Sequence, residues 1–122
     1  MARTRRRQRM TYERGDVVWG PDPFKQGESP RPWLILNNER HPFGDEEYMT
    51  VTITTTPHEG GVPITEDDWL NGGMPRKSYA SPWTVASPKH DAIVRIQGRL
   101  SEAFVQEVVE ELVEYLEPIG DG

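Results

Sequence analysis

The stretch YMTVTITTT (residues 48–56) alternates apolar and hydroxyl-bearing side chains more regularly than any other part of the chain. Such alternation predicts a β-strand with an apolar face toward the core and a row of hydroxyls on a solvated face. The predicted core-facing residues are Met49, Val51 and Ile53, and the predicted solvated residues are Thr50, Thr52 and Thr54. This strand anchors the rest of the interpretation.

Short apolar runs bounded by turn residues surround this strand and predict further strands. PWLILNN is wholly apolar up to its two asparagines, which is typical of a strand buried on both faces. Pro82 interrupts one of the later runs, which suits an edge or a bulge. TEDDWLNGGMPRKS (residues 65–78) is rich in turn residues and predicts no regular element. The predicted strands are GDVVWG (15–20), PWLILNN (32–38), residues 62–64, YASPWTVAS (79–87) and AIVRIQG (92–98).

The apolar period changes near residue 101, where SEAFVQEVVEELVEYL begins. Phe104, Val108, Leu112 and Leu116 recur every four residues, which predicts an amphipathic helix with Ser101 as its N-cap. Short strands followed by one helix predict a mainly β (α+β) fold, a small barrel or strongly bent sheet of five to seven strands with the helix packed on it.

Length and composition indicate one domain. The chain has 122 residues and no cysteine, and 34% of its residues are hydrophobic. No apolar run approaches the roughly 20 residues that cross a bilayer, so we expect a cytoplasmic protein without a membrane partner. We expect a single domain over residues 12–118 and a short tail over 119–122.

The charge of the chain is uneven. The net charge is −6, yet residues 1–14 hold six arginines and a single acid, Glu13, so a basic arm precedes a strongly acidic body. Such an arm (residues 1–11) is either a disordered tail or a contact to nucleic-acid phosphates, and both interpretations stay open.

Few residues in the sequence carry an obvious chemistry. The three histidines have neither metal-ligand spacing nor a nucleophile elbow nearby, so no metal site or hydrolase triad is predicted. Arg31 is of interest because it stands immediately before the buried run PWLILNN. It is either a solvated edge residue or a cation held rigidly against an anionic partner.

Three motifs in the expected order resemble the PemK/MazF family of toxin endoribonucleases. They are RGDVVW (residues 14–19), RPWLIL (31–36) and IQGRLSEAFVQEVVEELVEYL (96–116). The resemblance covers residues 14–116 and implies an SH3-like barrel, usually a homodimer, that cleaves single-stranded RNA without a metal or cofactor. It also implies a cognate antitoxin protein as partner.

The resemblance implies Arg31 and Thr54 as the catalytic pair. Alternation favours Thr54 over the neighbouring Thr55 and Thr56, because Thr54 shares a face with Thr50 and Thr52. Further contacts to RNA are implied at Lys25, Glu28, Ser29, Thr55 and Lys89.

The implied chemistry is physically reasonable. RNA supplies its own nucleophile, the 2′-hydroxyl, and a guanidinium suits the phosphoryl oxygens that gain charge. Arginine is a poor general base, so the identity of the base stays open.

Two departures from the family pattern favour an alternative function. The loop before Arg31 reads GESPRP, about three residues shorter than is usual in the family, and Lys89 stands where the family often has arginine. An inactive barrel that binds RNA, DNA or a regulatory protein partner is therefore the second hypothesis.

Overall fold

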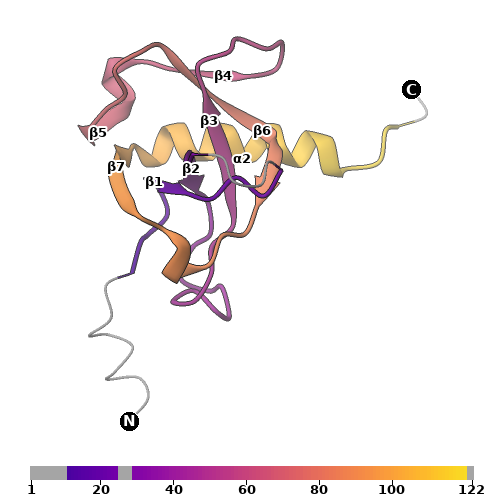
Figure 1. Cartoon of the computed structure of the whole chain (residues 1–122). Coiled ribbons are helices and arrows are strands. Elements are labelled where there is room, and N and C mark those ends of the chain that lie inside the picture. Colours follow the sequence, from indigo (N-terminus) through magenta and orange to yellow (C-terminus); the bar gives the residue numbers. More distant parts are fainter. Residues whose placement is uncertain (1–10, 25–28, 121–122) are drawn as a thin grey trace.

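The computed structural model describes residues 11–24 and 29–120. These residues form one curled antiparallel sheet of seven strands with the order β4-β6-β3-β2-β1-β7-β5, and a single long helix, α2, follows the last strand (Figure 1). The prediction of a small barrel of five to seven strands with a C-terminal helix is confirmed. The predicted arm at residues 1–11 lies outside the described residues except for Thr11.

Every predicted strand is present, with shifts of a few residues at the ends. One strand, β5, was not predicted; it pairs with β7 along the edge of the sheet, within the segment that looked like turns. Two single-turn 3-10 helices, Glu66–Asp68 and His90–Ala92, lie between strands. The strands are β1 (Asp16–Gly20), β2 (Arg31–Ile35), β3 (Thr50–Thr54), β4 (Val62–Ile64), β5 (Trp69–Gly72), β6 (Ser78–Ala86) and β7 (Arg95–Leu100), and the helix is α2 (Glu102–Leu116).

The prediction of a solvated hydroxyl face on β3 is wrong for two of its three threonines. Thr50 is fully buried and Thr52 is 5% exposed. Their hydroxyls donate to backbone carbonyls, Thr50 to Ala86 at 2.9 Å and Thr52 to Pro32 at 3.2 Å. Met49, predicted to face the core, precedes the strand and is 49% exposed. In the ladder with β2, Thr50 lies opposite Ile35 and Thr52 opposite Trp33, so the threonines share a face of the sheet with buried apolar side chains.

Two groups of buried residues stabilise the sheet, one on each side of its central strands. The larger group lies between the sheet and α2 and includes Leu34 of β2 and Phe104 and Val108 of α2. The smaller group holds Trp33 and Ile35 from the same strand. Strand β2 is therefore buried on both faces, as its apolar sequence predicts, and this makes it a rigid support for the residue at its start.

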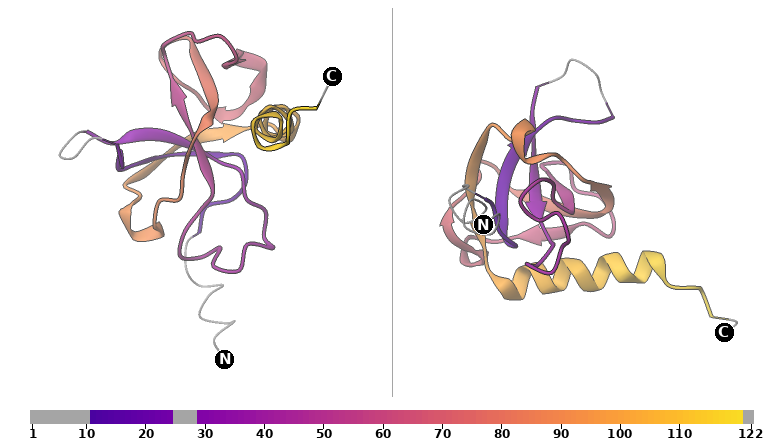
Figure 2. Two further views of the ribbon diagram at one scale, coloured as in Figure 1. Left: turned by 90° about the vertical axis from the view of Figure 1, so that its right-hand side faces the viewer. Right: turned by 90° about the horizontal axis from the view of Figure 1, so that it is seen from below.

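The helix follows its predicted pattern only over its first half. Ser101 is the N-cap, and its hydroxyl accepts the backbone N–H of Phe104 at 3.2 Å. Val113 and Leu116, which continue the apolar stripe, are 39% and 72% exposed. Figure 2 shows the reason: the C-terminal part of α2 runs beyond the strands. Within the described part of the chain, no helix has the length and apolar character needed to cross a membrane.

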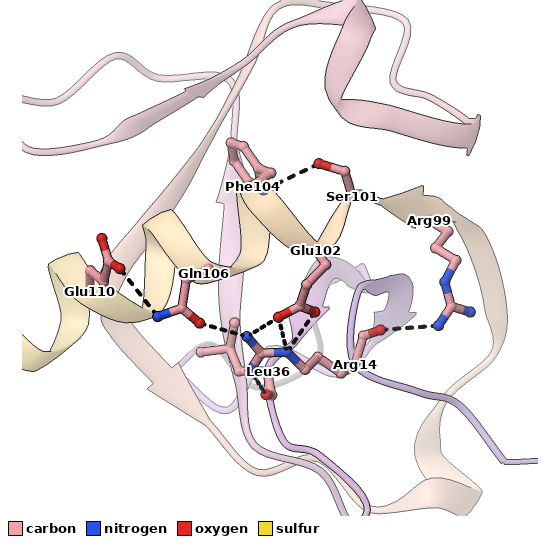
Figure 3. Close-up of polar contacts among 8 residues, drawn as sticks. All are labelled: Arg14, Leu36, Arg99, Ser101, Glu102, Phe104, Gln106 and Glu110. Atoms are coloured by element: carbon pink, nitrogen blue, oxygen red, sulfur yellow. Dashed lines mark hydrogen bonds and ion pairs between the residues drawn. The ribbon is translucent and has the colours of Figure 1, made fainter.

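Arg14, which lies just before β1, pairs with Glu102 in the first turn of α2 (Figure 3). Its guanidinium donates to both carboxylate oxygens of Glu102, at 2.7 to 3.1 Å, and to the backbone carbonyl of Leu36 at 2.8 Å. This hydrogen-bonded pairing with Arg14 lowers the pKa of Glu102 below its usual value. This one side chain therefore links α2 to the segments just before β1 and just after β2.

Replacing Arg14 with glutamine should return the pKa of Glu102 toward the ordinary glutamate value, because the cation that favours the carboxylate is lost. A lowered pKa in the folded state means that this contact stabilises the fold above the unfolded-state value of 4.5 and is lost as pH falls through the lowered pKa. The carboxyl carbon of Glu102, followed by NMR over pH 2 to 7, measures the change. Arg40→Gln, at an exposed position elsewhere, is the control; an unaltered Glu102 titration in the Arg14 variant would contradict the prediction.

Candidate functional site

The register of the central strands sets Arg31 against Thr54. In the β2–β3 ladder Trp33 lies opposite Thr52, and the strands are antiparallel. Continuing this register by two residues sets Arg31, the first residue of β2, opposite Thr54, the last residue of β3. Residues that lie opposite one another in adjacent strands direct their side chains to the same face of the sheet. Two residues 23 positions apart in sequence are thus neighbours.

Arg31 and Thr54 line one shallow pocket of about 130 Å³ at the end of the central strands. Its floor contains the buried residues Trp33 and Thr52. The remaining lining residues come from the loop after β1, the β3–β4 loop and β6. They are Phe24, His58, Ser81, Trp83 and Thr84. The pocket therefore combines a cation, several hydroxyls and aromatic walls.

Arg31 is oriented by a buried carboxylate. Its Nη1 donates to Oδ2 of Asp22 at 3.3 Å, and the Asp22 side chain is 2% exposed, whereas that of Arg31 is 37% exposed. The other carboxylate oxygen of Asp22 accepts the backbone N–H of Phe24 at 2.8 Å. A buried carboxylate is costly without a charged or hydrogen-bonded partner, so Asp22 restrains the guanidinium. Part of that guanidinium stays open to the pocket.

An irregular pairing between β3 and β6 builds the opposite wall. Val51 pairs with Val85, but the next residue, Thr52, pairs with Ser81, so three residues of β6 are left out of the ladder. Pro82, the middle of the predicted strand, begins this bulge, where the absence of its N–H costs no ladder hydrogen bond. The other two residues, Trp83 and Thr84, line the pocket. The predicted bulge is confirmed, and it shapes the candidate site.

Of the other predicted contact residues, those that the structure describes do not line this pocket. Lys25 and Glu28 are outside the described residues. Ser29 and Thr55 are exposed and border the segments that carry Arg31 and Thr54. Lys89 is paired with Glu47 at 2.5 Å, and this carboxylate raises the pKa of Lys89. The structure thus brings Arg31 and Thr54 together and leaves Lys89 engaged elsewhere.

Several residues of the site were not predicted as part of it, among them Asp22, His58 and Trp83. Each lies in a segment that the sequence marks as a loop or an interrupted strand, where no periodic pattern indicates the direction of a side chain. The position of Asp22 between two prolines is a signal that the sequence does offer. A carboxylate in a rigid turn is suited to orient a neighbouring side chain. These residues come together with Arg31 and Thr54 because of the order of the strands in the sheet.

A larger hollow of about 720 Å³ lies near the start of α2 and is a weaker candidate. Its two arginines already have carboxylate partners: Arg14 is paired with Glu102, and Arg99 with Glu13 and Asp16. Over residues 11–24 and 29–120, no group of three histidine or acidic side chains is arranged to hold a metal ion. The small pocket is the better candidate because it contains both Arg31 and Thr54.

Comparison with known sequences gives no match: neither a family model nor a curated protein sequence is similar to this chain over any part. Comparison of structures, in contrast, gives many similar folds.

Three solved structures illustrate the likeness. An endoribonuclease from a mycobacterial species, in complex with its cognate antitoxin, has 20% identity and a TM-score of 0.67, with 90% of this chain and 98% of that chain covered. The Mycobacterium tuberculosis toxin MazF-mt6 has 20% identity and a TM-score of 0.62, with 86% and 99% covered. A MazE–MazF complex from Deinococcus radiodurans has 12% identity and a TM-score of 0.65, with 90% and 99% covered. The chain has the MazF-like fold over nearly its whole length.

Proposed function

We propose that this chain is a metal-independent endoribonuclease toxin of a toxin-antitoxin pair that cleaves single-stranded RNA. The observation that carries the proposal is the shared pocket of Arg31 and Thr54 at the end of adjacent central strands. The MazF-like fold supports it, because solved proteins with this fold include endoribonucleases and a toxin.

The chemistry required of the protein is modest. The 2′-oxygen of a nucleotide attacks the adjacent phosphorus, a 2′,3′-cyclic phosphate forms, and the bond from phosphorus to the 5′-oxygen breaks. Arg31 stabilises the negative charge that grows on the phosphoryl oxygens, and its fork of N–H donors matches their geometry. Thr54 adds a hydroxyl donor on a stiff β-branched side chain. Both groups are fixed before the substrate arrives.

Purified protein incubated with single-stranded RNA and EDTA tests the proposal. We expect cleavage products that end in a 2′,3′-cyclic phosphate, identified by mass spectrometry. The control is the same oligonucleotide with 2′-O-methyl groups, which lacks the nucleophile and should stay intact. Absence of cleavage at every salt concentration would contradict the proposal.

The proposed partners are a cognate antitoxin, single-stranded RNA and a second copy of the chain, in the cytoplasm. Solved complexes of this fold with an antitoxin support the first. Exposed apolar side chains support the homodimer, among them Leu70 of β5, Ile96 of β7 and Leu116 of α2. Light scattering should give about twice the chain mass of 14.0 kDa at micromolar concentration. A monomer mass under those conditions would contradict the dimer.

A second function, binding without catalysis, is favoured by one observation. The positive charge of Arg31 is already partly balanced by Asp22, and the pocket is small. A barrel that only binds nucleic acid or protein would retain RNA without turnover and would bind equally well after Thr54→Ala. RNA cleavage by the wild-type protein excludes this alternative.

A further inference from the structure

His58 lies in the wall of the candidate site, although it is far from Arg31 in sequence. It belongs to the β3–β4 loop and lines the same pocket as Arg31 and Thr54. Three residues separate it from Thr54, the last residue of β3. A titratable side chain is thus placed beside the proposed catalytic pair.

The His58 side chain is exposed, and its ring packs against one aromatic side chain. The ring meets the edge of Trp83 with their centroids 6.0 Å apart, and Trp83 packs in the same way on Tyr115 of α2 at 6.1 Å. Gly60 lets the loop approach this stack closely. A Cβ there would lie 2.9 Å from the Tyr115 hydroxyl, and the positive φ of 91° suits glycine. The backbone N–H of Gly61 donates to the His58 carbonyl at 3.0 Å and closes the turn.

The pocket needs a group that takes up a proton, and the residues around His58 leave few choices. Arginine stays protonated, and the hydroxyls of Thr54, Ser81 and Thr84 are weak bases. Among the described lining residues there is no carboxylate, since Asp22 lies behind Arg31 and is bonded to it. Imidazole is the side chain that exchanges a proton near neutral pH.

We propose that His58 is the general base of the reaction, a role that rests on the proposed function. Its neutral imidazole accepts the proton of the 2′-hydroxyl as the 2′-oxygen bonds to phosphorus. The bond to the 5′-oxygen breaks, and that oxygen takes a proton from water. The imidazolium then returns its proton to solvent, so atoms and charge balance over the cycle.

The test compares wild type with His58→Gln, which keeps a polar side chain of similar size but exchanges no proton. The value of kcat should fall by about 100-fold, whereas KM and the affinity for 2′-O-methyl RNA should change by less than about threefold. The pH dependence of kcat in the wild type should be lost in the variant. Glu59→Gln, at the next and exposed position of the same loop, is the matched control and should behave as wild type.

Few charged or titratable groups lie around His58 in the described part of the chain, so single substitutions can distinguish their effects on the pH profile. Arg31 approaches from β2 with Asp22 behind it, Tyr115 lies behind Trp83 on α2, and Glu59 shares the loop. The β6 lining residues are uncharged. A pH profile that survives in Glu59→Gln and Tyr115→Phe but disappears in His58→Gln supports the proposal.

Two results would overturn it, and they are distinguishable. If wild type cleaves RNA and His58→Gln cleaves at the same rate with the same pH profile, His58 is not the base, while the proposed function stands. If wild type fails to cleave RNA, the proposed function and the role of His58 both fall. Restoration of the His58→Ala variant by added imidazole would support the proton-transfer role directly.

Discussion

Replacing Arg31 with alanine should lower the rate of RNA cleavage by about 1,000-fold, the largest effect on activity that we expect from a single substitution. The guanidinium is the one cation among the described residues of the pocket. Removing a fixed donor that stabilises charge in the transition state reduces kcat more than it weakens binding. Arg31→Lys keeps the charge but loses the fork of donors, so an intermediate rate is expected.

Single-turnover cleavage of a labelled oligonucleotide in EDTA measures this effect. The exposed Arg76, which lies outside the pocket, supplies the control: Arg76→Ala should retain the wild-type rate. Asp22→Asn tests the orienting contact, because Arg31 remains but its charged partner is lost; we expect a loss of about tenfold in kcat. Equal rates for wild type and Arg31→Ala would exclude Arg31 from catalysis.

Replacing Leu34 with alanine should reduce the free energy of unfolding by about 2 to 5 kcal/mol, the largest stability effect expected. Leu34 is fully buried in the central strand β2 and packs in the group of residues beneath α2. Truncation leaves a cavity that a strand paired on both sides cannot close. Since domains of this kind unfold with about 5 to 15 kcal/mol, the variant should be close to the limit of folding.

Urea unfolding followed by far-UV circular dichroism gives the change. Ile119→Ala is the matched control, because Ile119 is 95% exposed after the end of α2 and its truncation should cost less than about 0.5 kcal/mol. A loss below about 1 kcal/mol for Leu34→Ala would show that the core beneath α2 rearranges to fill the space.

The sequence predicts those parts of this fold that depend on local pattern. The apolar run of β2, the capped start of α2 and the proline bulge of β6 each carry their own signal, and each is confirmed. Strand β5 carries no such local signal, since it contains Asn71 and Gly72 and is mostly exposed. It forms because β7 offers an open edge with which it can pair. Thr50 and Thr52 follow a pattern typical of a solvated face, but they lie beside the buried residues Ile35 and Trp33 of β2.

The same distinction applies to the candidate site. Resemblance of short motifs suggested Arg31 and Thr54, and the register shows how a strand start and a strand end become neighbours. Asp22 and His58 join them through loop paths and aromatic packing, which no periodicity encodes. These four residues therefore become neighbours only when the sheet has folded.

The strand order also fixes when the site can come into existence during synthesis. The lining of the pocket extends along the chain from Phe24 to Thr84, and its last wall belongs to β6, which inserts between β3 and β4. A nascent chain that ends before Ser78 carries both Arg31 and Thr54 but neither the Trp83 wall nor its ring contact with His58. Most of the chain must therefore leave the ribosome before the pocket is complete.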